Sequence, residues 1–175
     1  MTYYSPEHFP WAIQLAENWL AIRTEYEQLH DEMLMSWPEE DMYEGGWDVF
    51  GLQAFGTPMH DNCELCPVTT ELCRRVPNMT TAGFSVLKPG SHILPHVGYS
   101  DNVLRFHLGL IVPAGCALKV GNTVCPWLEG GCIVFDDTVE HEAWNSHEKI
   151  TRAILLVDFL KPKRLPPPME PFSIL

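Results

Sequence analysis

Short β-rich runs separated by glycine, proline and asparagine constrain the fold of this chain more than any other feature. They lie at residues 47–55, 83–87, 103–112, 116–120, 132–135 and 152–159. No long helical pattern lies between them, so an antiparallel sandwich or jelly roll is favoured over a parallel α/β sheet. The segment Val-Gly-Asn-Thr at residues 120–123 predicts a hairpin turn.

The N-terminal part predicts one amphipathic helix over about residues 10–35. Apolar side chains recur there at intervals of three and four residues, at Leu15, Trp19, Ile22, Tyr26 and Leu29. This spacing places them on one face of a helix, and Pro10 suits its first turn. We expect this helix to pack on the β core, and we expect no second helical region of comparable length.

Length and composition favour a single domain over residues 1–175. The chain has 175 residues, of which 46% are hydrophobic, so folding can hide roughly 70% of the surface of the unfolded chain. We expect the β core to span about residues 47–162. The proline-rich segment 162–175 is expected to form an extended tail on the surface, because proline cannot take part in a central strand.

Charge and hydropathy exclude several kinds of partner. The chain carries 11 basic and 23 acidic residues, a formal net charge of −12, whereas a nucleic acid partner requires a basic surface. No apolar run approaches the roughly 18 residues of a membrane-spanning helix, and no secretory signal opens the sequence. We therefore expect no nucleic acid partner, no membrane partner and a cytoplasmic location.

The six cysteines fall into two groups of three. Cys63, Cys66 and Cys73 lie in a polar stretch, whereas the other three lie in strand-like segments. A structural zinc site usually has four ligands, and a CxxC redox centre usually belongs to a βαβ unit. We expect reduced loop thiols here and favour them over a bound metal. A disulfide from Cys73 to Cys63 or Cys66 requires an oxidising compartment.

The strand expected over residues 103–112 has one apolar face and one face with charged and polar side chains. Arg105 and His107 leave the same face, and Leu104, Phe106 and Leu108 leave the other. An arginine that points into a barrel requires an anion there, which can be a carboxylate side chain or a ligand.

Further polar residues occur near other strands. We expect His96 and His141 in turns that flank strands, and Arg152 opens a strand of its own. Each of them alone is compatible with an ordinary surface role. Together, two histidines and two arginines facing one interior suit a barrel that holds a metal and a dicarboxylate. For Asp136 and Asp137, a role in orienting a ligand or closing a turn is favoured over acid–base catalysis.

Five spaced elements resemble the aspartyl/asparaginyl β-hydroxylase family of Fe(II)- and 2-oxoglutarate-dependent dioxygenases. They are His96-x-Gly98, Arg105-x-His107-Leu108-Gly109-Leu110, Phe135-Asp136-Asp137, His141-Glu142-x-Trp144 and Arg152. The resemblance covers about residues 47–162. It implies a mainly β fold, a double-stranded β-helix of the jelly-roll, cupin-like kind. It also implies that His96 and His141 bind iron, with water in place of the usual acidic ligand at Gly98.

The same resemblance assigns the cosubstrate contacts. Ser85 and Arg152 match positions that bind the distal carboxylate of 2-oxoglutarate, and Arg105 and His107 match positions near its metal-bound carboxylate. The implied reaction uses Fe(II), 2-oxoglutarate and O2 to hydroxylate a C–H bond. The prime substrate would be an amino acid, a peptide or a small metabolite, with the β-carbon of Asp or Asn as the position that the family name implies.

Two other functions remain open from the sequence. A cupin-type isomerase or hydrolase that uses a divalent metal as a Lewis acid would also place histidines inside a barrel. In a non-enzymatic, metal-independent β-barrel that binds a small anion, His96 and His141 would be ordinary polar residues.

Overall fold

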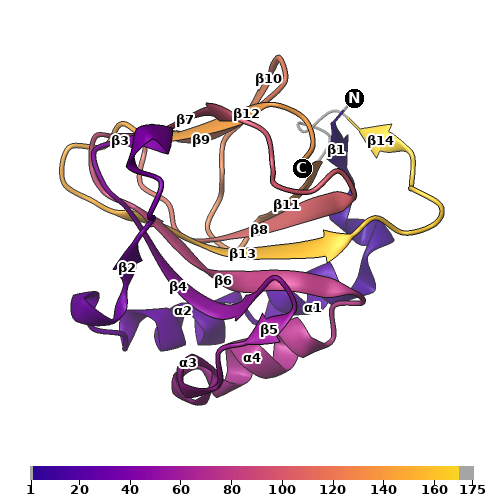
Figure 1. Cartoon of the computed structure of the whole chain (residues 1–175), viewed down its shortest axis with the longest axis horizontal. Coiled ribbons are helices and arrows are strands. Elements are labelled where there is room, and N and C mark those ends of the chain that lie inside the picture. Colours follow the sequence, from indigo (N-terminus) through magenta and orange to yellow (C-terminus); the bar gives the residue numbers. More distant parts are fainter. Residues whose placement is uncertain (1, 170–175) are drawn as a thin grey trace.

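The computed structural model describes residues 2–169, which form two facing antiparallel β-sheets with helices on one side (Figure 1). Along the larger sheet the neighbouring strands are β14 (Pro168–Met169), β1 (Tyr3–Tyr4), β11 (Cys132–Asp136), β8 (Val103–Ile111), β13 (Arg152–Leu160), β6 (Met79–Leu87), β4 (Trp47–Ala54) and β2 (Met35–Ser36), and β5 (Thr57–Pro58) pairs with β4. The smaller sheet contains β10 (Thr123–Cys125), β9 (Cys116–Val120), β12 (His141–Asn145), β7 (Ser91–His96) and β3 (Tyr43–Glu44). The expected jelly-roll architecture is confirmed.

Each strand run expected from the sequence is found, as β4, β6, β8, β9, β11 and β13. The expected hairpin is also present, because Val120 pairs with Thr123 and Gly121 adopts a φ of 57°. The expectation that His96 and His141 lie in turns was wrong. His96 ends β7 and His141 begins β12, two short strands that were not predicted.

The expected single helix over residues 10–35 is two helices, α1 (Pro10–Glu17) and α2 (Trp19–Glu27). Asn18 separates them, and its side-chain amide donates to the Gln14 carbonyl oxygen at 2.8 Å. Such a side-chain hydrogen bond competes with the helix backbone. After α2 the chain forms a short 3₁₀ helix, Asp31–Met33, and then β2, which pairs with β4. The predicted helix is therefore too long at its C-terminal end, since residues 31–33 and 35–36 form other elements.

A second helical region is present, contrary to expectation. It consists of α3 (His60–Leu65) and α4 (Pro67–Arg74), and the three cysteines expected in a loop belong to it. Cys63, Cys66 and Cys73 are buried free thiols in the core beneath the larger sheet. Among the described residues, no helix is both long enough and apolar enough to cross a membrane.

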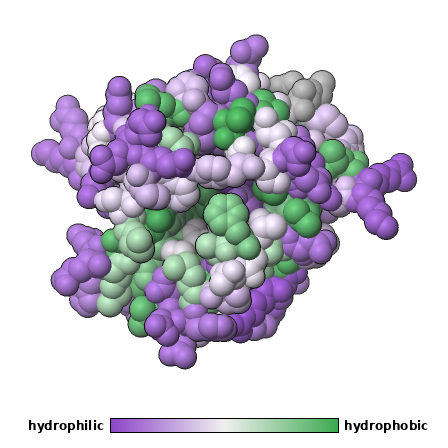
Figure 2. Space-filling model, in the orientation of Figure 1, coloured by the Kyte–Doolittle hydropathy of each residue, from purple (hydrophilic) through white to green (hydrophobic). Residues whose placement is uncertain are grey.

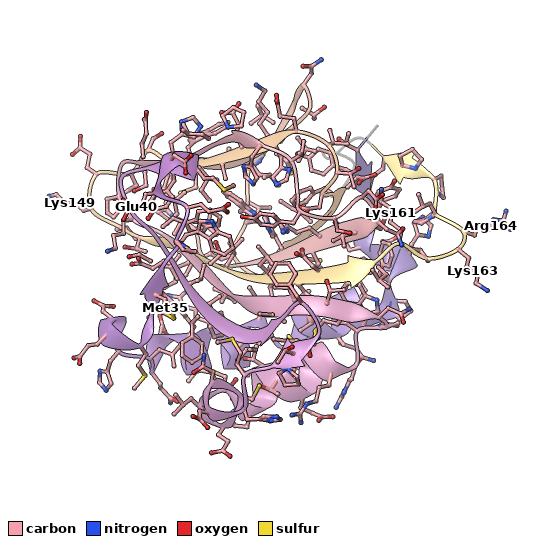
Figure 3. All side chains as sticks on the ribbon, viewed as in Figure 1. Met35, Glu40, Lys149, Lys161, Lys163 and Arg164 are labelled. Carbon is pink, nitrogen blue, oxygen red and sulfur yellow. The ribbon has the colours of Figure 1, made fainter. Side chains whose placement is uncertain are left out.

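The proline-rich segment lies mostly exposed on the surface over residues 162–169, as expected, and its pairing with β1 was not predicted. Lys161 donates its N–H to the Asn102 carbonyl oxygen at 3.0 Å, and Pro168–Met169 forms β14 against β1. In Figure 3, Lys163 and Arg164 project outward from the loop between β13 and β14. The remainder of the expected tail, residues 170–175, lies outside the described residues.

Two apolar cores lie on opposite faces of the larger sheet. The helices cover its outer face, where Leu15 and Ile22 pack with Phe84, Phe106 and Leu155. The second core fills the space between the two sheets and includes Tyr3, Leu118, Trp127, Phe135 and Ile154. Polar side chains that point between the sheets are therefore enclosed by apolar walls, and this is where Arg105, His107 and Arg152 lie.

Candidate active site

His96 and His141 lie opposite each other on neighbouring strands of the smaller sheet. The register pairs their Cα atoms, and the centroids of their rings are 4.3 Å apart. The fold therefore brings together the two residues that were expected to bind iron.

One hydrogen bond orients each of these rings. Nδ1 of His96 lies 2.7 Å from the Leu94 carbonyl oxygen, and Nδ1 of His141 lies 2.8 Å from the Val139 carbonyl oxygen. Because a carbonyl only accepts, each Nδ1 carries the proton and each Nε2 keeps its lone pair. Nε2 of His141 is buried and has no hydrogen-bond partner within residues 2–169. Histidines that bind metals are oriented in this way, so these two residues fit a divalent metal ion.

Burial keeps both imidazoles neutral. It lowers the pKa of His96, and it lowers the pKa of His141 to about 3, with the nearby charge of Arg105 acting in the same direction. A neutral imidazole can bind a metal without first losing a proton. At neutral pH both rings are therefore in the ligand form.

The carboxylate of Asp137 fills the space beside Gly98. The N–H of Gly98 donates to the Asp137 carbonyl oxygen at 2.8 Å, and a Cβ added at Gly98 would overlap the Asp137 carboxylate. Oδ1 of Asp137 lies 3.4 Å from Nε2 of His141. Within residues 2–169, no group of three or more His, Cys, Asp or Glu side chains is arranged to hold a metal. The candidate metal site thus consists of two histidines with Asp137 beside them.

The preceding aspartate has a structural role. Oδ1 of Asp136 accepts from the backbone N–H and the hydroxyl of Thr138, at 3.1 and 2.7 Å. It also forms an ion pair with Lys161 at 2.9 Å. Asp136 therefore closes the turn that presents Asp137 to the site.

Arg105 is neutralised by two aspartates. Its Nε and Nη2 donate to the two carboxylate oxygens of Asp158, at 2.7 and 2.8 Å, and its Nη1 lies 2.8 Å from Asp137 Oδ1. Asp158 stands directly opposite Arg105 on β13. The sequence left open whether a carboxylate side chain or a ligand accompanies Arg105. The structure shows two carboxylate side chains in contact with it. In this arrangement Arg105 holds Asp137 beside His141, and its expected position near the metal-bound carboxylate of 2-oxoglutarate stays a prediction.

Arg152 differs from Arg105, because no acidic side chain within residues 2–169 forms an ion pair with it. It is 1% exposed, its Nη2 donates to Ser85 Oγ at 3.4 Å, and its Nε has no partner. Burial lowers its pKa to about 10. A buried charge without a counter-ion is costly, so this geometry suits an anionic ligand. Ser85 and Arg152 come together as expected, and Trp47 Nε1 also donates to Ser85 Oγ, at 3.0 Å.

His107 is buried between the candidate metal site and Arg152. Burial lowers the pKa of His107 well below its ordinary value, and the positive charges of Arg105 and Arg152 act in the same direction. Its Nδ1 accepts from Trp127 Nε1 at 3.3 Å, and its Nε2 has no partner. His107 therefore faces the same interior as the other expected site residues.

Two residues of the site were not identified from the sequence. Asp158 follows Arg152 at an even spacing, so the alternation of the strand could have placed it on the interior face. Trp127 lies in the loop between β10 and β11, where no periodic pattern exists. Its guanidinium contact, 4.8 Å from the ring centroid to Cζ of Arg152, is visible only in the tertiary structure.

Exposed apolar side chains lie next to the candidate metal site. Val97 and Tyr99 directly follow His96 and are 58% and 59% exposed, and Phe55, which contacts Tyr99, is 74% exposed. The ring of Trp37 also lies near Tyr99, at 6.4 Å between centroids. Figure 2 shows apolar surface gathered in a hollow between two more hydrophilic layers. Exposed apolar surface of this kind is typical of binding sites.

Comparison with known proteins gives a matching family and relatives that are all described as hydroxylases. Residues 16–162 match the family described as "Aspartyl/Asparaginyl beta-hydroxylase". The chain is 40% identical over 174 residues to the ornithine lipid ester-linked acyl 2-hydroxylase of Rhizobium tropici, covering 93% of this chain and 62% of that protein. It is 34% identical over 161 residues to the aspartyl/asparaginyl beta-hydroxylase of Homo sapiens, covering 87% of this chain and 21% of that protein. The chain thus spans only part of both relatives.

Among solved structures, a Pseudomonas putida prolyl-4-hydroxylase has a similar fold. The TM-score is 0.57 at 16% sequence identity, with 84% of this chain and 88% of that chain covered. This likeness concerns the fold alone, and it agrees with the jelly roll described above. Because the family match extends over most of its length, the chain belongs to the aspartyl/asparaginyl β-hydroxylase family.

Proposed function

We propose that this protein is an Fe(II)- and 2-oxoglutarate-dependent dioxygenase that hydroxylates an unactivated C–H bond. The observation that carries the proposal is the presence, in one enclosed interior, of two oriented neutral histidines and a buried arginine without an acidic partner. A 2-oxo acid that chelates a metal at one end and carries a carboxylate at the other matches both features.

Each residue would have a distinct role. His96 and His141 would hold Fe(II) through Nε2. Arg152 and Ser85 would bind the distal carboxylate of 2-oxoglutarate, because a guanidinium meets a carboxylate through two parallel hydrogen bonds. Arg105 would act indirectly, by holding Asp137 beside the metal site. The bound iron supplies the oxygen chemistry, in which R–H, O2 and 2-oxoglutarate give R–OH, succinate and CO2.

The walls of the interior would exclude water from the reaction. Phe135 packs against both His107 and His141, with ring centroids 5.1 and 5.4 Å apart, and Tyr3 and Ile154 extend the same apolar core. A dry surrounding strengthens the contact between Arg152 and a carboxylate.

For the prime substrate, we infer a methylene group next to a carboxyl-derived carbon. The names of the two relatives share this feature, since both the 2-position of an ester-linked acyl chain and the β-carbon of Asp or Asn are such groups. The exposed apolar side chains beside His96 favour an acyl chain over an acidic side chain. An Asp or Asn residue, or a free amino acid or small metabolite, is the second candidate, supported by the family description.

Anaerobic addition of Fe(II) and 2-oxoglutarate tests the first proposal. The visible charge-transfer band of the iron chelate should appear, and admission of O2 should release succinate. Arg152→Leu should raise the 2-oxoglutarate concentration required by about a hundredfold or more, whereas Arg75→Gln, at an exposed position directly after α4, should not change it. Turnover of a substrate without O2 and 2-oxoglutarate would instead support a cupin-type isomerase or hydrolase.

The substrate inference is tested by comparing an ester-linked acyl ornithine lipid with an aspartate-containing peptide. Product gains one oxygen atom in mass, and its fragmentation locates the hydroxyl. Hydroxylation of the peptide alone would overturn the preference for an acyl chain and leave the dioxygenase proposal intact.

A further inference from the structure

We propose that Trp127 is a positioning residue that makes His107 a hydrogen-bond donor to a carboxylate oxygen of the bound cosubstrate. The proposal rests on the function proposed above, and it adds a residue to which no role has been assigned. Trp127 is 2% exposed and lies in the interior core between the sheets.

The contact between the two rings determines where the proton of His107 lies. The indole Nε1 can only donate a hydrogen bond, and it lies 3.3 Å from Nδ1 of His107. Nδ1 must therefore be the unprotonated nitrogen. A neutral imidazole then carries its proton on Nε2.

This tautomer is opposite to that of the candidate metal ligands. In His96 and His141 a backbone carbonyl holds the proton on Nδ1 and leaves the lone pair on Nε2. Two of the three interior histidines, His96 and His141, can therefore bind a metal through Nε2. The third, His107, presents an N–H at this position. A protonated Nε2 cannot bind a metal, so His107 is not a third ligand.

Among residues 2–169, no side chain or backbone group accepts a hydrogen bond from the N–H of His107. Its Nε2 is buried without a partner, although buried polar groups are almost always hydrogen-bonded. The same indole ring lies over the Arg152 guanidinium, at 4.8 Å, and Nε of Arg152 also has no partner. One rigid side chain therefore places two unpartnered donors in the same interior, which fits a ligand that is rich in acceptor oxygens.

Trp127→Phe tests the proposal, because it keeps a ring over Arg152 and removes the N–H donor. The loss of one hydrogen bond corresponds to about a two- to tenfold change, so the KM for 2-oxoglutarate should rise by that factor with little change in the KM for the prime substrate. His107→Gln provides the matched background, since its amide N–H can replace Nε2–H without a partner at Nδ1. In the His107→Gln protein, Trp127→Phe should raise the KM for 2-oxoglutarate by a smaller factor. That remaining factor measures only the altered contact between the ring at position 127 and Arg152.

The tautomer can also be measured directly in the metal-free protein by ¹⁵N NMR of labelled histidines. His107 should be protonated at Nε2, whereas His96 and His141, as internal references, should be protonated at Nδ1. In Trp127→Phe the proton of His107 should redistribute toward Nδ1. If His107 keeps Nε2 protonated in this variant, or if the KM effect is the same in both backgrounds, the proposal is overturned. Failure of the unsubstituted protein to bind 2-oxoglutarate would instead reject the proposed function, and the tautomer result would still stand.

Discussion

Replacing Arg152 by methionine should make the ligand-free protein more stable while abolishing its response to 2-oxoglutarate. Methionine has a similar length and no charge, so it can fill the site without a counter-ion. Residues that bind ligands are often suboptimal for stability, and a buried arginine without an acidic partner is an example of this conflict.

The magnitude follows from the pKa of Arg152. Burial lowers this pKa from 12.5 to about 10, and each unit corresponds to roughly 1.4 kcal/mol, so the buried charge costs about 3 kcal/mol. The sign agrees with linkage: between pH 10 and 12.5 the unfolded chain binds more protons, so stability rises with pH there, and at pH 7 the full cost is present. Loss of the contact with Trp127 offsets about 2 kcal/mol. The net gain is about 1 kcal/mol, or roughly 2–4 °C in Tm.

Thermal unfolding without ligand, with metal alone, and with metal plus 2-oxoglutarate under anaerobic conditions provides the assay. At a ligand concentration of about 100 Kd, the unsubstituted protein should gain roughly 3 kcal/mol from 2-oxoglutarate. The Arg152→Met protein should gain only from the metal, and Arg75→Met, at the exposed position directly after α4, should behave like the unsubstituted protein. A ligand-free Arg152→Met protein that unfolds several degrees lower, or one that retains the response to 2-oxoglutarate, would refute the reasoning.

Three further substitutions have defined outcomes. Gly98→Ala should displace the Asp137 carboxylate and weaken Fe(II) binding several-fold by metal titration, and unchanged binding would show that Asp137 does not influence the metal. Glu25→Ala should lower Tm by about 5–10 °C, because three hydrogen bonds at the start of α4 are lost; an unchanged Tm would remove Glu25 as its cap. Asp158→Asn should destabilise the protein by about 3 kcal/mol in denaturant unfolding, since Arg105 loses half of its counter-charge, and a loss below about 1 kcal/mol would contradict this.

Alternation along the strands was readable from the sequence. In β8 the apolar residues Leu104, Phe106 and Leu108 pack beneath the helices, as expected, while Arg105 and His107 face the interior. Side chains of a strand must alternate between faces, so one apolar face is enough to locate the other. The preference for an antiparallel β fold follows from such local patterns, whereas the candidate site residues came from the resemblance of the spaced motifs to the hydroxylase family.

The helical segments show where local patterns are insufficient. The start of α4 is capped by Glu25, whose carboxylate accepts from the backbone N–H groups of Val68 and Thr69 at 2.8 Å each. This cap comes from a residue more than 40 positions earlier, so local spacing does not reveal it. Pro67 at the first position of α4 is a local start signal, but the stretch with the cysteines was interpreted as a loop. The helix predicted to reach residue 35 ends at Glu27, and residues 35–36 pair with β4, a contact that depends on a strand more than ten positions away.

By itself, the sequence determined which residue types face the interior, because strand periodicity depends only on neighbouring positions in the chain. Only the tertiary structure decided how the charges in that interior are shared. Arg105 is satisfied by Asp137 and Asp158, whereas Arg152 has only Ser85 and the face of Trp127. Electrostatic and hydrogen-bond partners act at distances of a few ångströms in space, and the fold brings these residues together from strands and loops that lie far apart in the sequence.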